Sequence, residues 1–534
     1  MVTGREEYDL IIVGTGAGGG TLAHQLATTG KRILILERGD FLPQEKENWD
    51  PTEVYEKARY YNADEKWVNQ SGEAFDPQTG YWVGGNTKLY GAALLRMREK
   101  DFTEVVHKDG LSPAWPLEYD DFEAFYHQAE VLFDVCGQRG EDPTEPAASG
   151  DYARPPLIHE PAMAAIVNQL KTKGYHPFHL PVGLKRDEHH PTRSQCIRCD
   201  TCDGFPCLLH AKGDSDVNCI RPIRDLDNVT LVTGARVKQI LTDDSGRKAT
   251  AVVAEIDGEE QLFSAGVIAI ACGAINSAAL LLRSTNAQHP NGLANSSDQV
   301  GRNLMKHLAT TMVSLNLEPN PAMHQKTICV SDFYWGEEDF PYPMGLVQNT
   351  GNVKGAMLPD QAPSLLEPFI KAAPDALLDE VASRATGWWL QTEDLPDADN
   401  RVRVVDGQIH VDYTPNNLEA RDRLIARWTE VLKSIDHQTQ HVIPFSFYPR
   451  SIQPLPAVSH QCGTCRFGCD PQTSVLDLNC CTHDVENLYV VDSSFFPSNA
   501  GVNPTLTIVA NAIRVAEHLK ARLETKATPA LVSV

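Results

Sequence analysis

A glycine-rich turn near the N-terminus constrains the fold of this chain more than any other feature. An apolar run rich in β-branched residues, Asp9–Val13, leads directly into the turn Gly14–Gly19, and a helix is expected over Thr21–Thr28. Gly30 ends that helix before a second apolar run, Ile33–Leu36. Strand, turn, helix and strand in this order predict a βαβ unit on a parallel sheet.

The spacing of the glycines indicates a dinucleotide site on this unit. Gly14 permits a tight turn, Gly16 lets the backbone approach a pyrophosphate, and Gly19 lets the helix pack on the strand. Free N–H groups at the start of the helix favour an anion there. Glu37, 23 residues after Gly14, is placed to accept a hydrogen bond from an adenosine ribose hydroxyl. This pattern alone does not distinguish NAD from FAD.

A second glycine cluster favours a flavin. The segment Tyr81–Gly91 contains Gly84, Gly85 and Asn86 and lies far outside the first βαβ unit. It resembles the Val-Gly-Gly-x-Ser/Thr segment that lies along the flavin in the glucose–methanol–choline (GMC) oxidoreductases. Other matches to that family are Ile268–Ser277, Val300–His307, Leu488–Pro497 and Asn503–Thr505. The chain is therefore identified as a member of this family from residue 8 to about residue 520.

The resemblance implies an α/β fold of two parts. One is a Rossmann-like FAD-binding domain, and the other is an α+β substrate domain with an antiparallel sheet, as in the p-hydroxybenzoate hydroxylase-like architecture. The FAD-binding domain is expected to be discontinuous, from residues 1–100, 200–310 and 456–534. The substrate-binding domain and its covering segments are expected from residues 101–199 and 311–455.

Alternating apolar residues in the second half of the chain predict antiparallel strands. Such runs are Leu346–Gln348, Arg401–Val405 and Ile409–Tyr413, and a long helix is expected over Leu418–Asp436. The family resemblance implies a six-stranded sheet backed by helices here. The aromatic and acidic stretch Asp332–Pro343 is interpreted as a lid or a pocket wall, with a plain surface loop as the alternative.

The C-terminal motif completes the expected cofactor site. The apolar run Leu488–Val491 ends at Asp492, and a helix is expected over Thr505–Arg522. In the family, the start of this helix lies beside the part of the flavin where negative charge accumulates on reduction. Val237 resembles a family position whose backbone meets the adenine, with an ordinary strand residue as the alternative. The expected cofactor-binding residues are Gly14, Gly16, Gly19, Glu37, Gly84, Gly85, Asn86, Val237, Asp492, Asn503, Pro504 and Thr505.

Two residues are candidates for the chemistry. Removing a hydride from an alcohol carbon requires that the hydroxyl proton leave as well, so a base must stand near the substrate oxygen. His460 lies in a segment that resembles the family's His-x-x-Gly-Thr motif, and Asn503 matches the second member of the family's active-site pair. The pair is similar to that of pyranose oxidases and choline oxidases, with the amide donating to the substrate oxygen. His307 is expected to fix structure near the cofactor.

The thirteen cysteines leave several readings open. Cys196, Cys199, Cys202 and Cys207 have a spacing near that of an iron–sulfur ligand run, but the last interval is one residue too long and no proline follows. Zinc ligands and structural thiols are the alternatives, and we predict no metal. Three further cysteines follow His460 closely in the sequence, and they are not expected to be ligands: Cys462, Cys465 and Cys469. The family position that carries a flavin-linking histidine falls on Leu89, so noncovalent FAD is expected.

These observations predict an FAD-dependent enzyme that oxidises a primary or secondary alcohol of a sugar, glycoside or polyol. Oxygen or a quinone would accept the electrons. The alternatives are a dehydrogenase that passes electrons to a quinone or iron–sulfur partner, a non-redox lyase and a binding protein. Acidic residues outnumber basic ones 71 to 47, giving a net charge of −24, which argues against nucleic acids and anionic membranes as partners. With no visible signal or membrane span, a cytoplasmic location is expected.

Overall fold

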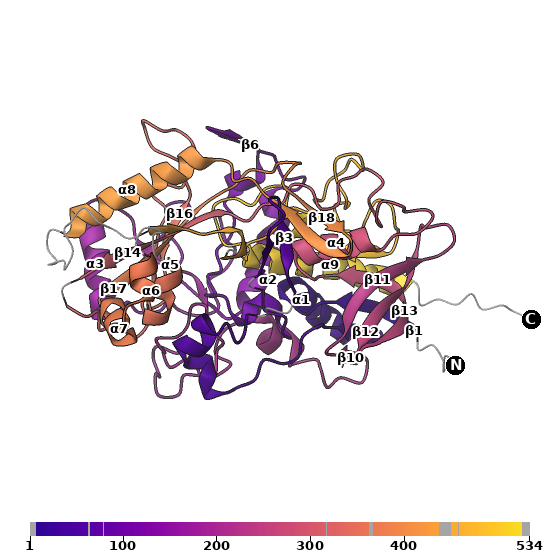
Figure 1. Ribbon diagram of the computed structural model, residues 1–534, viewed down its shortest axis with the longest axis horizontal. Coiled ribbons are helices and arrows are strands. Elements are labelled where there is room, and N and C mark those ends of the chain that lie inside the picture. The colour runs from indigo at the N-terminus through magenta and orange to yellow at the C-terminus, as the bar shows by residue number, and fades with distance from the viewer. Residues whose placement is uncertain are drawn as a thin grey trace, which may run out of the picture.

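The structure is a computed structural model, and it describes most of the chain. The described residues are 7–61, 65–77, 79–316, 318–361, 367–436, 450–457 and 459–525. Residues 1–6, on which the expected lack of a signal partly rests, and 437–449 of the expected substrate domain lie outside them. Figure 1 shows a sheet built around β1 at one end of the molecule and a second sheet, with α8 beside it, at the other.

The first sheet has seven strands and contains the predicted βαβ unit. Strands β1 (Glu7–Val13), β2 (Ile33–Leu36) and β10 (Val229–Val232) are parallel to one another. β13 (Glu259–Ile270) pairs in parallel with β1 and with β21 (Leu488–Val490) along its second half. Its first half pairs antiparallel with β12 (Ala249–Ile256), which pairs with β11 (Arg236–Thr242). Apolar side chains fill the parallel strands because both faces of this part of the sheet are buried.

The first helix begins earlier than the sequence predicts. Helix α1 spans Ala17–Leu26 and includes three glycines, although glycine is a poor helix former. Tertiary packing explains this difference, because a Cβ on Gly18 would lie 1.7 Å from the carbonyl oxygen of Val491. A Cβ on Gly19 would lie 2.1 Å from the carbonyl oxygen of Gly14. The missing side chains therefore let α1 dock against the ends of β1 and β21.

The second sheet has six strands, all antiparallel, in the order β20-β14-β17-β16-β15-β8. Helices α8 and α3 pack on one another, and α8 also packs on β14 and β17. Trp388 of β17 meets Trp428 of α8 with ring centroids 4.9 Å apart, inside a second apolar core. The strands are β20 (Arg450–Ile452), β14 (Leu308–Leu315), β17 (Ala385–Thr392), β16 (Leu346–Asn349), β15 (Ile328–Val330) and β8 (Phe178–His179), and the helices are α8 (Leu418–Asp436) and α3 (Pro161–Thr172).

Two of the predicted strands belong to another sheet. β18 (Arg401–Val405) and β19 (Gln408–Asp412) are antiparallel strands, as predicted, and they pair with each other in a hairpin. However, β19 pairs with β3 (Trp67–Asn69) and not with the six-stranded sheet. β4 (Ala74–Phe75) completes this four-stranded sheet. The alternation of apolar residues identifies a strand, but it holds no information about the partner, which here comes from a segment more than three hundred residues earlier.

The remaining elements connect and cover the two larger sheets. Helix α9 packs against α1 and α2 on the first sheet. Its observed span, and that of α8, agree with the helices predicted from the sequence. The remaining elements are β5 (Val105–His107), β6 (Gly110–Ser112), α2 (Tyr119–Leu132), β7 (Val135–Cys136), β9 (Val182–Gly183), α4 (Ala274–Arg283), α5 (Leu358–Gln361), α6 (Glu367–Lys371), α7 (Asp375–Ser383) and α9 (Thr505–Thr525).

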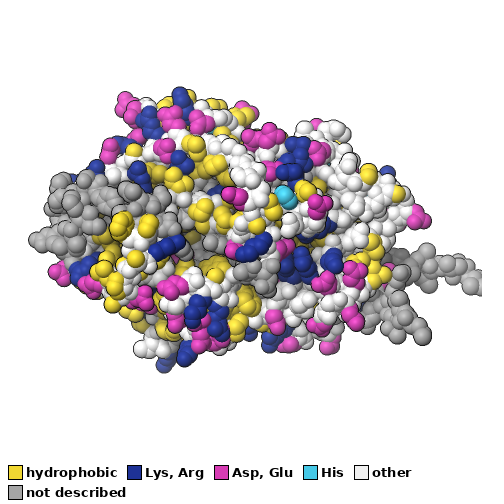
Figure 2. Space-filling view, in the orientation of Figure 1, with side chains coloured by type: hydrophobic (Ala, Val, Ile, Leu, Met, Phe, Trp, Pro, Cys, Tyr) yellow, Lys and Arg dark blue, Asp and Glu magenta, His cyan; other side chains and the backbone are white. Residues whose placement is uncertain are grey.

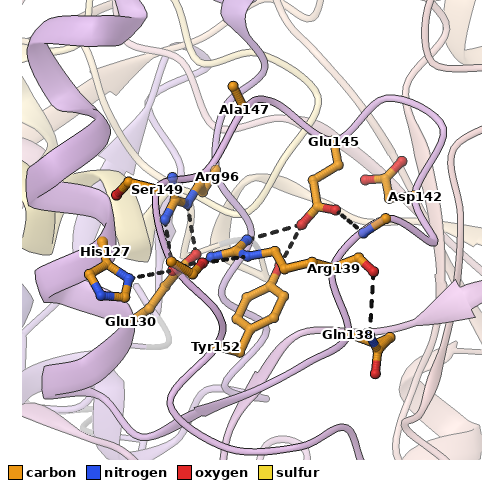
Figure 3. A network of polar contacts seen from close by, with 12 residues as sticks. Arg96, His127, Glu130, Gln138, Arg139, Asp142, Glu145, Ala147, Ser149 and Tyr152 are labelled. Atoms are coloured by element: carbon orange, nitrogen blue, oxygen red, sulfur yellow. Dashed lines mark hydrogen bonds and ion pairs between the residues drawn. The ribbon is translucent and has the colours of Figure 1, made fainter.

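A buried ion-pair network fixes the segments that carry Arg96 and Arg139 to Glu130 of α2 (Figure 3). The Glu130 carboxylate is fully buried and accepts two hydrogen bonds from Arg96, at 2.7 and 2.8 Å. It also accepts one from Arg139 at 2.5 Å, and Arg139 donates to Glu145 at 3.0 Å. Two guanidinium groups thus compensate the buried carboxylate, so that removing one partner would leave a buried charge.

The surface carries charges of both signs. Figure 2 shows acidic and basic side chains interspersed over the face drawn there, with apolar side chains between them. Within the described ranges, no helix combines the length and the apolar character that crossing a membrane requires.

Candidate active site

A cavity of about 790 Å³ is bounded by the two larger sheets. The turn after β1 and the second glycine cluster contribute to its wall, as do the C-terminal motif and side chains from β14, β16 and β17. Eleven of the residues predicted for cofactor binding or catalysis line it: Gly14, Gly16, Glu37, Gly85, Asn86, Val237, His460, Asp492, Asn503, Pro504 and Thr505. Gly19 and Gly84 stand behind the wall, where Gly84 N–H donates to Thr15 Oγ1 at 3.0 Å.

The Glu37 end of the cavity is rigidly held. Thr15 donates to Glu37 Oε2 from its backbone N–H at 2.9 Å and from its hydroxyl at 2.6 Å. The N–H of Gly39 donates to Oε1 at 2.9 Å. Burial raises the pKa of Glu37, and these hydrogen bonds oppose that shift. Thr15 was not singled out from the sequence, because its role depends on Glu37 lying next to it at the ends of paired strands.

The turn leaves room for a phosphate group at the start of α1. Gly14 has φ +97°, which a side chain would disfavour. A Cβ built on Gly16 has no atom within 4 Å, because Gly16 faces the open cavity. The first N–H groups of α1 follow directly after Gly16. The residues present therefore fit a dinucleotide whose diphosphate lies at this helix N-terminus.

Asp492 fixes the junction between β21 and α4. Its carboxylate accepts hydrogen bonds from Ser277 and Ser494 hydroxyls, both at 2.5 Å, and from the N–H groups of Gly273 and Ser494 at 3.0 and 2.9 Å. Burial raises its pKa. Each oxygen thus already accepts two hydrogen bonds, so the side chain holds the wall of the cavity in place.

His460 lies on the cavity wall beside a second histidine. Its ring stands perpendicular to that of His307, with centroids 5.2 Å apart, and 6.4 Å from the ring of Trp389. Burial, the neighbouring His307 and the positive charge of Lys326 lower the pKa of His460 well below its ordinary value. The imidazole is therefore neutral near pH 7, which is the protonation state that a general base requires.

His307 holds the loop that precedes Asn503. It is fully buried, and its Nε2 lies 2.9 Å from the carbonyl oxygen of Ala500. Burial lowers its pKa, so a neutral ring donates this hydrogen bond. The backbone N–H of Ala500 donates to Glu393 at 3.2 Å, and that of Gly501 donates to the Tyr334 hydroxyl at 3.0 Å. Three buried side chains thus fix this loop.

Asn503 faces the same cavity and is oriented by a neighbour from the second sheet. Gln348 of β16 donates from Nε2 to Asn503 Oδ1 at 3.0 Å. The Asn503 amide therefore has its oxygen occupied and its NH₂ group left for another acceptor. Gln348 was not singled out from the sequence. Its strand was predicted, but the face of the strand that meets the cavity was not.

Comparison with known proteins identifies the architecture. Residues 8–309 match the N-terminal family model of the GMC oxidoreductases, and residues 394–512 match the C-terminal one. The chain belongs to the GMC oxidoreductase family. This confirms the resemblance found in the sequence, and with it the fold of a Rossmann-like domain joined to an α+β substrate domain. Proteins of this family are FAD-binding flavoproteins and oxidoreductases.

Curated relatives of this GMC oxidoreductase include two oxidases from Streptomyces. The 6'''-hydroxyparomomycin C oxidase of Streptomyces lividus is 30% identical, with 96% of this chain and 92% of the relative aligned. The paromamine 6'-oxidase of Streptomyces fradiae is 30% identical, with 98% and 93% aligned. Among solved structures, formate oxidase from Aspergillus oryzae superposes with a TM-score of 0.70 at 15% identity, covering 98% of this chain and 100% of that one.

An ion pair lies in the cavity wall of this GMC oxidoreductase. Lys326 donates from Nζ to Asp203 Oδ2 at 2.7 Å, and Gly351 N–H donates to the same oxygen at 3.1 Å. Lys326, these hydrogen bonds and Lys212 lower the pKa of Asp203 against the effect of its burial. Both side chains line the cavity and both act electrostatically on His460. No sequence motif marks either residue.

The four spaced cysteines lie in the loop that carries Asp203. Cys196 is buried, whereas Cys199, Cys202 and Cys207 are half-buried, and all are free thiols. Burial raises the pKa of Cys196 to about 11. Across the residues that the structure describes, no group of three or more His, Cys, Asp or Glu side chains is arranged to hold a metal ion. The iron–sulfur and zinc interpretations thus find no preformed ligand set there. Of the later cysteines, Cys462 and Cys465 are buried and Cys469 is exposed.

The stretch Asp332–Pro343 is not a wall of the main cavity. None of its residues lines that cavity. Phe333, Tyr334 and Phe340 are buried, and the Tyr334 hydroxyl donates to Asp101 at 2.9 Å. The interpretation as a wall of the main cavity was therefore wrong, because these aromatic side chains pack inward. The segment supports the active site from behind, through the contact of Tyr334 with Gly501.

Proposed function

We propose that this chain oxidises a primary or secondary alcohol of a sugar, glycoside or polyol, with noncovalently bound FAD. The observation that carries the proposal is a neutral, cavity-lining His460 in the same cavity as Asn503 and the dinucleotide-fitting turn. The aminoglycoside oxidases among the relatives support a sugar-like substrate. Their names, and those of related fructose and gluconate dehydrogenases, favour redox chemistry over a lyase or a binding protein.

Each residue of the site has a separate role in the proposed reaction. Bound FAD would supply the acceptor for the hydride, which leaves the alcohol carbon with both electrons of the broken carbon–hydrogen bond. His460 takes the hydroxyl proton, and the alcohol carbon becomes a carbonyl. Asn503 donates from its NH₂ group to the reacting oxygen, which carries partial negative charge as the proton leaves. Gly16, Gly85 and the start of α1 would hold the diphosphate, and Glu37 the ribose.

Noncovalent attachment is supported by the side chains beside the second glycine cluster. Leu89 stands where the linking histidine of some relatives would fall, and its side chain carries no nucleophile. Tyr90 also lines the cavity, but its hydroxyl donates to the carbonyl oxygen of Gly213. Acid precipitation should therefore release FAD into the supernatant, whereas colour that stays with the protein pellet would contradict this part of the proposal.

The acceptor of the electrons is proposed to be oxygen or a quinone. The names of the relatives do not decide between these two acceptors, because they include both oxidases and dehydrogenases. We expect slow turnover with oxygen and faster turnover with quinone or dye acceptors, and equal or faster rates with oxygen would reverse that order.

The proposed location of the protein is the cytoplasm. Its thirteen free thiols are in keeping with this location, where thiols stay reduced.

An anaerobic substrate screen tests the function. Purified holoenzyme is mixed without oxygen with paromamine, methyl glucoside, fructose and gluconate, and the visible flavin absorbance is followed. We expect at least one of these alcohols to bleach the flavin and to yield a carbonyl product. A protein that binds FAD and is bleached by none of them, but is bleached by dithionite, would contradict the proposal.

A further inference from the structure

Gln348 stands at one end of a row of three side chains that cross the cavity face of the second sheet. It pairs in register with Trp389 of β17, which pairs with Thr311 of β14. All three side chains belong to residues that line the cavity. Gln348 is 1% exposed, so its amide is removed from bulk water.

The two ends of the Gln348 amide have different surroundings. Nε2 donates to Asn503 Oδ1 at 3.0 Å. Oε1 is buried and has no hydrogen-bond partner among the described residues. Buried polar atoms in folded proteins nearly always have a partner, so an unpaired acceptor on a cavity wall points to a donor supplied by a ligand.

The bond to Asn503 selects one of two amide orientations. If Gln348 donates, Asn503 must present its NH₂ group to the reacting alcohol oxygen. With an acceptor in place of that donor, Asn503 would turn its NH₂ group toward position 348 and present its oxygen to the substrate instead. An oxygen cannot donate to the alcohol oxygen, so the stabilising contact would be lost.

Other groups near this wall offer both hydrogen-bond donors and acceptors. The Lys326–Asp203 ion pair faces the same cavity, and Gly91 brings the backbone close to it. A ligand that reaches these groups and Gln348 must carry polar groups beyond the one that reacts. A simple monoalcohol would leave Gln348 Oε1 unpaired.

We propose that Gln348 is a positioning residue for Asn503 and also selects the substrate, by accepting a hydrogen bond from a second hydroxyl or amino group on it. This inference rests on the proposed alcohol oxidation. It adds that a second donor group of that substrate, a hydroxyl or an amino group, is recognised by Gln348.

Two variants separate the two roles. Gln348→Glu keeps the size and the acceptor but, when ionised, cannot donate to Asn503. Gln348→Leu removes both donor and acceptor. Gln391→Glu is the matched control, because Gln391 is also a fully buried glutamine of the same sheet but does not line the cavity.

The measurements are the limiting rate of anaerobic flavin reduction, the substrate Kd, the flavin content and the melting temperature. The probes are paromamine, methyl glucoside and their mono-deoxy analogues. For Gln348→Glu we expect the limiting rate to fall about tenfold or more, while Kd changes less than about threefold. For Gln348→Leu we expect the rate to fall and Kd to rise, and one deoxy analogue should bind the parent and this variant equally well.

The outcomes distinguish this inference from the proposed function. If no probe reduces the flavin of the parent protein, the proposed function fails and the inference fails with it. If the parent is reduced but Gln348→Glu is reduced at the parent rate, or if Gln391→Glu slows reduction equally, the positioning role is overturned. If every deoxy analogue loses affinity equally in the parent and in Gln348→Leu, the recognition role is overturned.

Discussion

At the scale of single residues, His460 and Asn503 are expected to contribute unequally. His460→Ala should lower the rate of flavin reduction roughly 10²–10⁴-fold, because the alcohol proton would have no acceptor. Asn503→Ala should lose less, since it removes one hydrogen bond to a partly charged oxygen, worth about 1.5–3 kcal/mol. Stopped-flow reduction and flavin content are measured on the same preparations. A His460→Ala protein that loses flavin or thermal stability, but reduces its remaining flavin at the parent rate, would show that His460 only supports the neighbouring turn.

The buried carboxyl group of Asp101 should make the free energy of unfolding depend on pH. Burial raises the pKa of Asp101 from its ordinary 3.8 to about 7. Between these values Asp101 holds a proton in the folded chain that it has released in the unfolded chain, so its contribution to the free energy of unfolding should fall as pH rises, by about 1.4 kcal/mol per pH unit.

Asp101→Asn stays neutral throughout and should lose this slope. Urea unfolding at several pH values between 4 and 8 measures it, with Asp109→Asn, an exposed position nearby, as the control. Equal slopes in the parent and in Asp101→Asn would show that Asp101 does not titrate in this window.

At the scale of elements, the docking of α1 predicts different effects for alanine substitutions at Gly16 and Gly18. A Cβ on Gly18 would lie 1.7 Å from the carbonyl oxygen of Val491, whereas a Cβ on Gly16 meets nothing within 4 Å. Gly18→Ala should therefore destabilise the protein even without cofactor. Gly16→Ala should leave the apoprotein's melting temperature near that of the parent but weaken FAD binding, because the methyl group enters the space next to the helix N-terminus. Thermal melting and FAD titration of the apoproteins decide this, and equal effects of the two changes in both assays would contradict it.

The elements also show what sequence reasoning could reach. Strands β1, β2, β16 and β21 and helices α8 and α9 were predictable because each carries its own apolar pattern or stop signal. The start of α1 was missed, since its glycines are helical only because of what they pack against. The sheet that contains β18 and β19 was missed because pairing depends on distant segments. Motifs pointed to His460 and Asn503, but Gln348 and the Lys326–Asp203 pair have no motif, and only the folded chain brings them to the cavity.

At the scale of the whole molecule, the net charge of −24 should favour the approach of positively charged substrates. If the substrate is an amino sugar, its kcat/KM should fall several-fold as salt is raised from low to high concentration, because the Debye length shrinks from about 30 Å at 0.01 M to about 3 Å at 1 M. A neutral sugar alcohol should show little change, and it serves as the control for any effect of salt on the protein itself. The comparison of paromamine with methyl glucoside, each over the same salt series with a neutral electron acceptor, measures the difference. A parallel decline for both would show that salt acts on the enzyme, and a flat profile for both would show that the overall charge does not steer the substrate.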